Sequence, residues 1–293
     1  MQIPLFPKVL IIGVGLIGGS MALCLKKQKM TDCVVGFDCD LLNAEAAKKA
    51  GIIDRIGHIF SEDIPTADLI ILAVPVGEMA NTMQAIASYL NDRCLLVDVG
   101  STKVSVIDAA RQYLGHHVER FVPSHPIAGA EKNGALAAKA DLFNNHQVVM
   151  TPLPENAVTS VGKINTFWEV CGASVVTMTA ERHDRFFAAV SHLPHLLSYA
   201  LVYEISRREN GDEFFSFAAG GFRDFTRIAA SSPHMWKDIC LANKAAILEE
   251  MTAYESVLSE LKDCLINEDS EHLMEIFEAS RKARRYWGEK KHW

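Results

Sequence analysis

Short, wholly apolar runs recur along the first part of the chain and alternate with segments whose apolar positions have helical spacing. Continuous apolar runs predict strands buried on both faces, and this alternation is typical of a parallel βαβ sheet. The predicted strands are 9–12, 33–37, 69–74, 94–97, 121–122, 147–150 and 174–176, and the clearest helices are 16–29 and 41–50.

The pattern changes after about residue 180, where strand-like runs disappear and long helical patterns begin. One or two helices are predicted over 185–208, bent at Pro194, and a last helix runs from 269 or 270 to 287. Another helix is predicted from Ser232, a preferred N-cap residue followed by Pro233 in the first turn, to Leu265, with an apolar stripe along one face. The sequence therefore predicts an α/β fold, with a Rossmann-type doubly wound sheet over 1–180 and an all-α dimerisation domain over 181–293. The dimer rests on analogy with other two-domain folds, and a self-contained helical bundle is the alternative.

Composition narrows the class of protein. The 293 residues are 49% hydrophobic and carry a net charge of −7, which argues against a nucleic-acid-binding surface. The seven cysteines form no Cys-x-x-Cys pair, as expected of free thiols in a reducing compartment. The sequence predicts no signal peptide, and no apolar run is expected to approach the roughly 18 residues of a membrane span. A cytoplasmic protein without membrane contact is expected.

A glycine-rich loop lies between the first predicted strand and helix, where a dinucleotide-binding fingerprint requires it. Gly13 permits the tight turn, Gly15 lets the backbone approach a pyrophosphate, and Gly18 lets the helix pack closely on the sheet. The following helix N-terminus favours the phosphate charge. The alternative interpretation is a glycine turn in an unrelated α/β protein.

Further residues complete the predicted cofactor site. Asp38 follows the second strand, where a carboxylate accepts hydrogen bonds from a ribose 2′-OH and repels a 2′-phosphate. This predicts NAD rather than NADP, although nearby Lys or Arg side chains would still accept a phosphate. The remaining cofactor-binding candidates are Leu16, Ile17, Val74, Pro75 and Ser101.

Two residues after later strands are candidates for the chemistry. Ser101 follows a strand at the carboxyl edge, where ligands bind in open α/β sheets; alternatively, it caps the next helix. His125 follows another short strand, between Pro123 and Pro126. An imidazole titrates near neutrality and can accept a hydroxyl proton while a hydride leaves the same carbon. The alternative for His125 is a histidine in an ordinary rigid loop.

Five motifs occur in a characteristic order, and together they closely resemble the prephenate/arogenate dehydrogenase family of tyrosine biosynthesis. They cover residues 13–20, 98–103, 124–131, 191–195 and 220–227. The resemblance extends from about Val9 to beyond Trp236. It implies a homodimeric enzyme that converts prephenate and NAD+ to 4-hydroxyphenylpyruvate, CO2 and NADH.

The resemblance also implies roles for individual residues. His125 would be the general base at the ring C4 hydroxyl, and Ser101 would hold that hydroxyl and the nicotinamide in register. Arg227 would bind the dicarboxylate, since a guanidinium suits bidentate bonds. The further substrate-binding matches are His195 and Trp236 in the pocket, Glu131 and Asp224 in a polar gate, and Arg223 and His183 near the substrate side chain or a feedback ligand.

Several alternatives remain beside this interpretation. Ala130 stands where the family motif often has Thr, and Arg223 stands where some members have Lys. Arogenate, instead of prephenate or in addition to it, is the nearest alternative substrate, and any tyrosine inhibition would have to occur at the active site itself. A hydroxyacid or imine reductase and a dinucleotide-sensing dimer without enzymatic activity are more distant alternatives. No metal is expected, because His192 and His195 lack a carboxylate or cysteine partner pattern.

Overall fold

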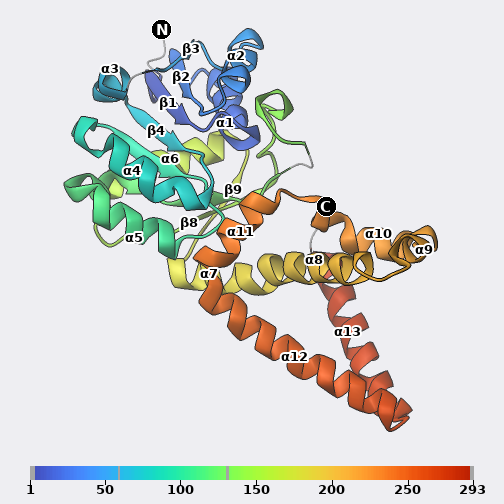
Figure 1. The fold of residues 1–293 in the computed structure, drawn as a ribbon. Coiled ribbons are helices and arrows are strands. Elements are labelled where there is room, and N and C mark those ends of the chain that lie inside the picture. The colour runs from blue at the N-terminus through green and yellow to red at the C-terminus, as the bar shows by residue number, and fades with distance from the viewer. Residues whose placement is uncertain (1–3, 59, 130–131, 291–293) are drawn as a thin grey trace. The chain divides into compact units, whose positions relative to one another are not determined.

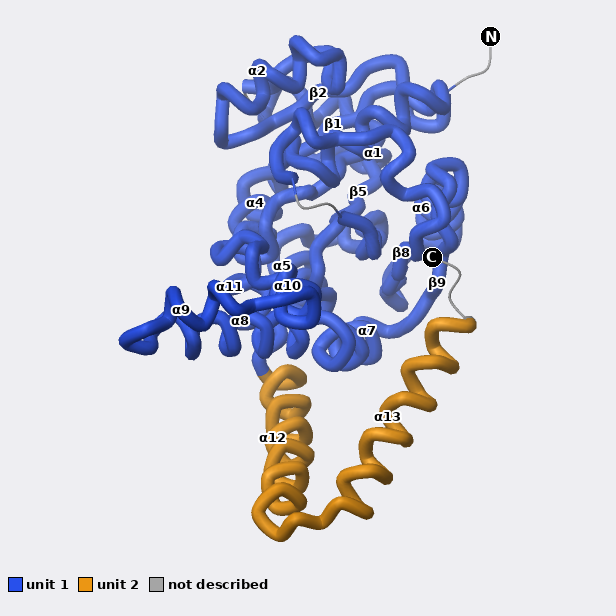
Figure 2. The backbone as a smooth tube through the Cα atoms, turned by 90° about the vertical axis from the view of Figure 1, so that its right-hand side faces the viewer, with its two compact units in different colours: residues 1–244 blue, residues 245–293 orange. Residues whose placement is uncertain are grey.

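The computed structural model describes residues 4–290 except 59, 130 and 131. Its internal contacts divide the chain into two compact units, residues 1–244 and residues 245–293 (Figure 2). The first unit contains both sheets and every predicted site residue that the structure describes.

A six-stranded parallel sheet forms the centre of the first unit, in the order β3-β2-β1-β4-β5-β6 (Figure 1). This is the strand order of a Rossmann fold, and the order reverses between β1 and β4, where such sheets bind ligands. The strands are β1 (Lys8–Ile12), β2 (Cys33–Phe37), β3 (Arg55–Ile56), β4 (Leu69–Leu72), β5 (Leu95–Asp98) and β6 (Phe121–Val122). The predicted fold class is confirmed.

Both faces of this sheet are buried, as the continuous apolar runs predict. In β1, Val9 and Ile11 belong to one apolar core, whereas Leu10 and Ile12 belong to another. Successive side chains of a strand point to opposite faces, so each strand contributes to both cores. The helices of the sheet domain are α1 (Leu16–Lys27), α2 (Leu41–Lys49), α3 (Phe60–Asp63), α4 (Met79–Ile86), α5 (Val104–Tyr113) and α6 (Val158–Val170).

A second sheet of three strands, in the order β7-β8-β9, follows directly on β6. Its strands are β7 (Ser124–Pro126), β8 (Gln147–Met150) and β9 (Ser174–Thr177). The pairing of β7 with β8 is antiparallel and places His125 opposite Val149. His125 is therefore held in a strand of three residues, and not in the loop that the flanking prolines suggest.

Helices complete the first unit. They are α7 (Ala180–Phe187), α8 (Leu193–Ser206), α9 (Gly211–Ser216), α10 (Gly220–Thr226) and α11 (Pro233–Ala242), and a π-helical turn, Ala188–His192, joins α7 to α8. Ser232 accepts a hydrogen bond from the Met235 N–H, which confirms the predicted N-cap of α11.

The segment Ala180–Ser206 is long and apolar enough to cross a membrane by length and composition. The expectation that no apolar run approaches this length is therefore wrong. The same segment carries His183, Asp184 and His192, which are buried and hydrogen-bonded inside the first unit. These contacts identify it as a site-bearing helix of the folded unit.

The single helix predicted from Ser232 to Leu265 is interrupted at Asn243, which ends α11 before α12 (Lys244–Ile266) begins. In the second unit, α12 leads to α13 (Ser270–Lys290), and His272 of α13 lies 2.8 Å from Glu260 of α12. Large apolar side chains are exposed along both helices, among them Leu248, Val257, Leu258, Leu265, Met274 and Phe277.

Candidate active site

Glycine is required at the three positions of the nucleotide loop for three different structural reasons. Gly13 has φ +94°, and a Cβ there would lie 2.4 Å from the carbonyl oxygen of Ala73. A Cβ on Gly18 would lie 2.2 Å from the carbonyl oxygen of Gly13, whereas a Cβ on Gly15 would meet nothing within 4 Å. Gly15 also precedes the N-terminus of α1, which has no side-chain cap. The free N–H groups beside open space fit a pyrophosphate, so the residues present suit a dinucleotide.

Asp38 is held at the end of β2 by three donors. One carboxylate oxygen accepts from the Val14 N–H and from Asn43 Nδ2, each at 2.9 Å, and the other accepts from the Asp40 N–H at 2.9 Å. These bonds fix the carboxylate beside the glycine loop, where the second strand of a Rossmann fold presents its acidic residue to a ribose.

A cavity of about 540 Å³ lies at the carboxyl edge of the parallel sheet. Ser101 and His125 line it together with the expected cofactor residues Gly15, Leu16, Ile17, Val74 and Pro75. Gly13, Gly18 and Asp38 are not among its lining residues, because the two glycines act in packing and Asp38 is turned toward the loop backbone. The predicted base and the glycine loop therefore face the same cavity.

His125 is the first member of a chain of two histidines and a carboxylate. Its Nδ1 lies 2.8 Å from Nε2 of His183, and Nδ1 of His183 lies 2.7 Å from Oδ1 of Asp184. If the ionised carboxylate accepts from His183 Nδ1–H, His183 Nε2 in turn accepts from His125 Nδ1–H. This arrangement leaves the Nε2 lone pair of His125 available as a base.

Asp184 is itself fixed from two sides. Its two oxygens accept from the N–H groups of Lys103 and Val104, at 2.8 and 3.0 Å, and so cap the N-terminus of α5. The alternative role of Ser101 as the cap of this helix is thus filled by Asp184. His183 is fully buried and is not among the residues that line either cavity; it lies behind His125, in hydrogen-bond contact with it.

Asp98 connects the two segments that carry Ser101 and His125. Its carboxylate accepts from the Gly100 N–H at 2.8 Å, from the Ser124 N–H at 3.1 Å and from the Lys103 ammonium group. Asp98 and Lys103 are completely buried, and Lys103 Nζ also donates to the Ser124 carbonyl oxygen at 2.7 Å. A buried ion pair with these added hydrogen bonds holds both functional segments in a fixed geometry.

The electrostatic surroundings keep His125 neutral. Burial lowers the pKa of His125 well below its ordinary value, and His183 and Lys103 lower it further. The pKa of His183 is also lowered, chiefly by burial, although Asp184 opposes the shift. A neutral imidazole at neutral pH is the form that a general base requires.

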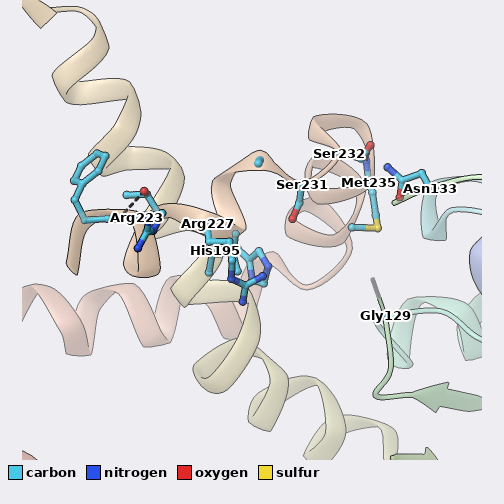
Figure 3. Close-up of a pocket in the computed structure, with 12 residues that line it drawn as sticks. Gly129, Asn133, His195, Arg223, Arg227, Ser231, Ser232 and Met235 are labelled. Atoms are coloured by element: carbon cyan, nitrogen blue, oxygen red, sulfur yellow. Dashed lines mark hydrogen bonds between the residues drawn. The ribbon is translucent and has the colours of Figure 1, made fainter. Parts of the chain in front are cut away.

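A second cavity, of about 860 Å³, lies among the helices that follow (Figure 3). His195 and Arg227 lie together on its wall, and Arg223 lies further along it. This cavity shares Gly129, Asn133, Ser232 and Met235 with the smaller one, so the two are adjacent. A molecule in the larger cavity can therefore reach toward His125.

Trp236 supports the wall of the larger cavity. Its ring stacks on His195, with centroids 3.6 Å apart, and Nδ1 of His195 donates to the Ser191 carbonyl oxygen at 2.8 Å. The indole Nε1 of Trp236 is buried without a hydrogen-bond partner among the described residues. A buried donor of this kind carries a free-energy penalty until it meets an acceptor.

Other predicted residues have different places. Arg223 and Asp224 are exposed, and Asp224 lines neither cavity. Glu131 and the atypical Ala130 lie outside the described residues. Sequence reasoning missed the lining residues Asn133, Met235 and Ile239, because an amide in a loop and two apolar residues of a helix carry no chemical signature.

A parallel Rossmann sheet, a glycine loop without a capping side chain, and a neutral histidine in the same cavity define a dinucleotide-dependent dehydrogenase. Two family models cover most of the chain: the nucleotide-binding domain of prephenate dehydrogenase matches residues 21–177, and its dimerization domain matches residues 179–279. The chain belongs to the prephenate dehydrogenase family, and it is an NAD-dependent dehydrogenase of that family.

Known relatives agree with this assignment. The chain is 36% identical to the cyclohexadienyl dehydrogenase of Zymomonas mobilis over 95% of both chains. It is 37% identical to the prephenate dehydrogenase of Bacillus subtilis, over 94% of this chain and 75% of the relative.

Solved structures show the same fold. Prephenate dehydrogenase from Aquifex aeolicus, in complex with hydroxyphenyl propionate and NAD+, is 32% identical with a TM-score of 0.89, over 96% of this chain and 98% of that one. The arogenate dehydrogenase of Synechocystis is 25% identical with a TM-score of 0.80, over 96% and 99%.

Proposed function

We propose that the protein catalyses the oxidative decarboxylation of prephenate to 4-hydroxyphenylpyruvate and CO2, with His125 as the general base. The observation that carries this proposal is the hydrogen-bonded chain His125–His183–Asp184, since it aims an unprotonated ring nitrogen at the cavity that the glycine loop borders. Residues 1–180 would bind NAD, and residues 181–293 would bind substrate and form a cytoplasmic homodimer.

His125 would act on the C4 hydroxyl of the substrate ring. Bound NAD+ supplies the acceptor for the hydride that leaves C4. His125 Nε2 takes the hydroxyl proton as the C4–O bond gains carbonyl character, and Ser101 holds that oxygen from the same cavity wall. The electron pair of the breaking C–C bond then enters the ring as CO2 leaves, and His125 returns the proton to the phenolate oxygen.

The larger cavity suits the two carboxylates of prephenate. Arg227 and Arg223 place positive charge on its wall, and guanidinium groups suit bidentate bonds to carboxylates. Among the described residues that line it, none is acidic. This favours the keto acid over arogenate, whose amino group would gain from a carboxylate partner.

Two alternatives follow from particular observations. Arogenate use, alone or with prephenate, is supported by the cyclohexadienyl dehydrogenase and arogenate dehydrogenase relatives. Tyrosine shares the hydroxyphenyl ring and the carboxylate of the product, with an amino group in place of the keto group, and would inhibit by occupying the same cavity. A dinucleotide sensor without activity is disfavoured, since a sensor has no need of a base held by two further buried residues.

The test is the rate of NADH or NADPH formation with prephenate and with arogenate, each with NAD+ and NADP+. We expect prephenate with NAD+ to give the highest kcat/KM. A higher value with arogenate would refute the proposed substrate, and equal use of NADP+ would refute the role of Asp38.

The role of His125 is tested by His125→Asn, with His146→Asn as the matched control at an exposed histidine. We expect kcat to fall by a factor of about 10² to 10⁴ in the first variant only, with NAD affinity unchanged, because general-base catalysis has this magnitude. Normal turnover by His125→Asn would remove this residue from the mechanism.

A further inference from the structure

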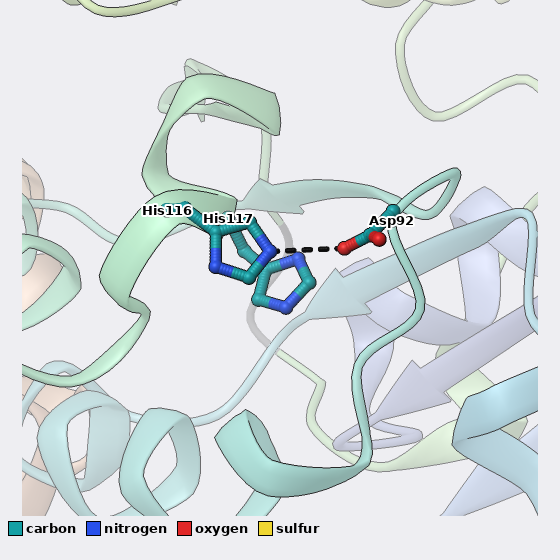
Figure 4. Close-up of side chains that lie close together, drawn as sticks. All are labelled: Asp92, His116 and His117. Atoms are coloured by element: carbon teal, nitrogen blue, oxygen red, sulfur yellow. Dashed lines mark hydrogen bonds and ion pairs between the residues drawn. The ribbon is translucent and has the colours of Figure 1, made fainter.

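A group of three potential metal ligands lies away from the active site (Figure 4). Asp92 precedes β5, and His116 and His117 lie in the 3-10 helix Gly115–Arg120, which precedes β6. β5 and β6 are parallel neighbours, so these residues lie at the amino edge of the sheet. The glycine loop and Ser101 lie at the opposite, carboxyl edge, and any ligand of this group is therefore separate from the cofactor.

The three side chains converge. Nε2 of His116 lies 2.9 Å from Oδ1 of Asp92, and the two imidazole rings lie against each other with centroids 4.0 Å apart. Figure 4 shows His117 facing the same carboxylate. One ligand atom from each residue falls within 4.8 Å of the others. Ligand atoms of one tetrahedral zinc ion lie about 3.4 Å apart, so a shift of roughly 1 to 1.5 Å between the side chains would complete the site.

That shift falls on mobile groups. The side chains of His116 and Asp92 are 72% and 81% exposed, so both rotate at little cost. His117 is only 7% exposed and provides the fixed ligand. A preformed buried ligand and two adjustable exposed ones together allow an ion to enter from solvent.

His117 supplies an independent observation. Its Nδ1 is buried without a hydrogen-bond partner among the residues that the structure describes. Buried imidazole nitrogens normally have a partner, and the absence of one leaves either a lone pair or an N–H unsatisfied.

The local charge is mixed, because Asp92 and Asp68 line a cavity together with Arg93, Arg120 and Lys163. Asp92 is the carboxylate that faces the two rings, while Arg120 and Glu119 form an ion pair at 3.7 Å and largely cancel. Two imidazoles with one carboxylate are ligands typical of zinc and related transition ions, whereas Mg²⁺ and Ca²⁺ prefer oxygen ligands alone.

We propose that Asp92, His116 and His117 bind one divalent transition-metal ion of the zinc class, with water in the remaining position. The ion would join the turn before β5 to the turn before β6 and would stabilise this edge of the sheet. The proposal departs from the sequence-based expectation of no metal, which considered only His192 and His195.

Zinc binding to the full chain by equilibrium dialysis, with elemental analysis, tests the proposal. We expect Asp92→Asn and His117→Gln to lose one equivalent of zinc, or to bind it at least tenfold more weakly than the unmodified protein. Asp92→Asn acts at an exposed residue, so its result stands if the substitution of buried His117 impairs folding. His146→Gln and Cys39→Ser, at an exposed histidine and an exposed cysteine, should bind zinc normally.

Heat stability gives a second readout. Zinc should raise the Tm of the unmodified protein and of both controls but not that of Asp92→Asn, while kcat of Asp92→Asn stays unchanged. Equal zinc stoichiometry and affinity in all variants would overturn the proposal. Loss of the bound zinc in Cys39→Ser or His146→Gln, but not in Asp92→Asn, would equally overturn it by placing the ion elsewhere.

Discussion

Protonation of His192 should destabilise the protein in mild acid. The residue is 1% exposed in the π-helical turn, and its Nδ1 lies 3.1 Å from Asn243 Nδ2. Burial is the main cause that lowers its pKa to about 4, against about 6.5 in an unfolded chain. Between these two values the unfolded state binds the proton and the folded state does not, so stability is lost as the pH falls through this window.

The size of the effect follows from the two pKa values. Each unit of difference corresponds to about 1.4 kcal/mol, so His192 alone should cost about 3 kcal/mol of unfolding free energy between pH 6.5 and pH 4. Within this pH window, the unfolding free energy should fall with a slope of up to about 1.4 kcal/mol per pH unit. His125, His183 and His117, whose pKa values are also lowered, add losses of the same sign.

Urea unfolding of the unmodified protein and of His192→Gln, at closely spaced pH values from 4 to 7, isolates the contribution of His192. The glutamine does not titrate, so the difference between the two unfolding free energies should shrink by about 3 kcal/mol toward acid pH. His146→Gln, at an exposed histidine, should follow the unmodified protein. Parallel curves for His192→Gln and the unmodified protein would refute the reasoning.

Three further predictions concern the active site. Arg227→Ala should mainly raise the KM for prephenate, and an unchanged KM would place this guanidinium outside the substrate site. Gly15→Ala should weaken NAD+ binding without lowering Tm, because its Cβ meets no protein atom but would face the phosphates. Gly162→Ala, inside α6, is a control that should leave NAD+ binding unchanged and raise Tm slightly, since alanine favours the helix. Finally, the acid limb of kcat/KM should lie below pH 6.5, since the pKa of His125 is lowered; a limb at or above pH 6.5 would contradict this environment.

The sheet domain could be predicted from the sequence because its signals are local. Strands such as Leu69–Leu72 are continuous apolar runs, and Gly13 and Gly18 are required by contacts that any Rossmann turn makes. The position of His125 after a strand followed from the same pattern. The neighbours of His125 could not be predicted in this way, because β7 pairs with β8 across a separation of more than twenty residues.

The partners of His125 could not be predicted for the same physical reason. His183 and Asp184 lie at the start of a helix nearly sixty residues later, and a charged pair in such a position usually faces solvent. The structure shows that Asp184 caps α5, a helix of the sheet domain. This contact also places the neighbouring His183 behind His125. The resemblance to the family singled out His183 as a functional residue, but it did not identify the contact between His183 and His125.

The break between α11 and α12 is explained by the same network. The periodicity favours one uninterrupted helix, yet Asn243 ends α11, and its buried amide donates to the carbonyl oxygen of Asp184 at 2.8 Å beside His192. α11 carries Met235 and Ile239 on the wall of the cofactor cavity. Asn243, which ends α11, therefore fixes the position of this helix relative to Asp184, which lies behind His125. Helical continuity is lost at this point, and the cavity wall gains a fixed relation to His125.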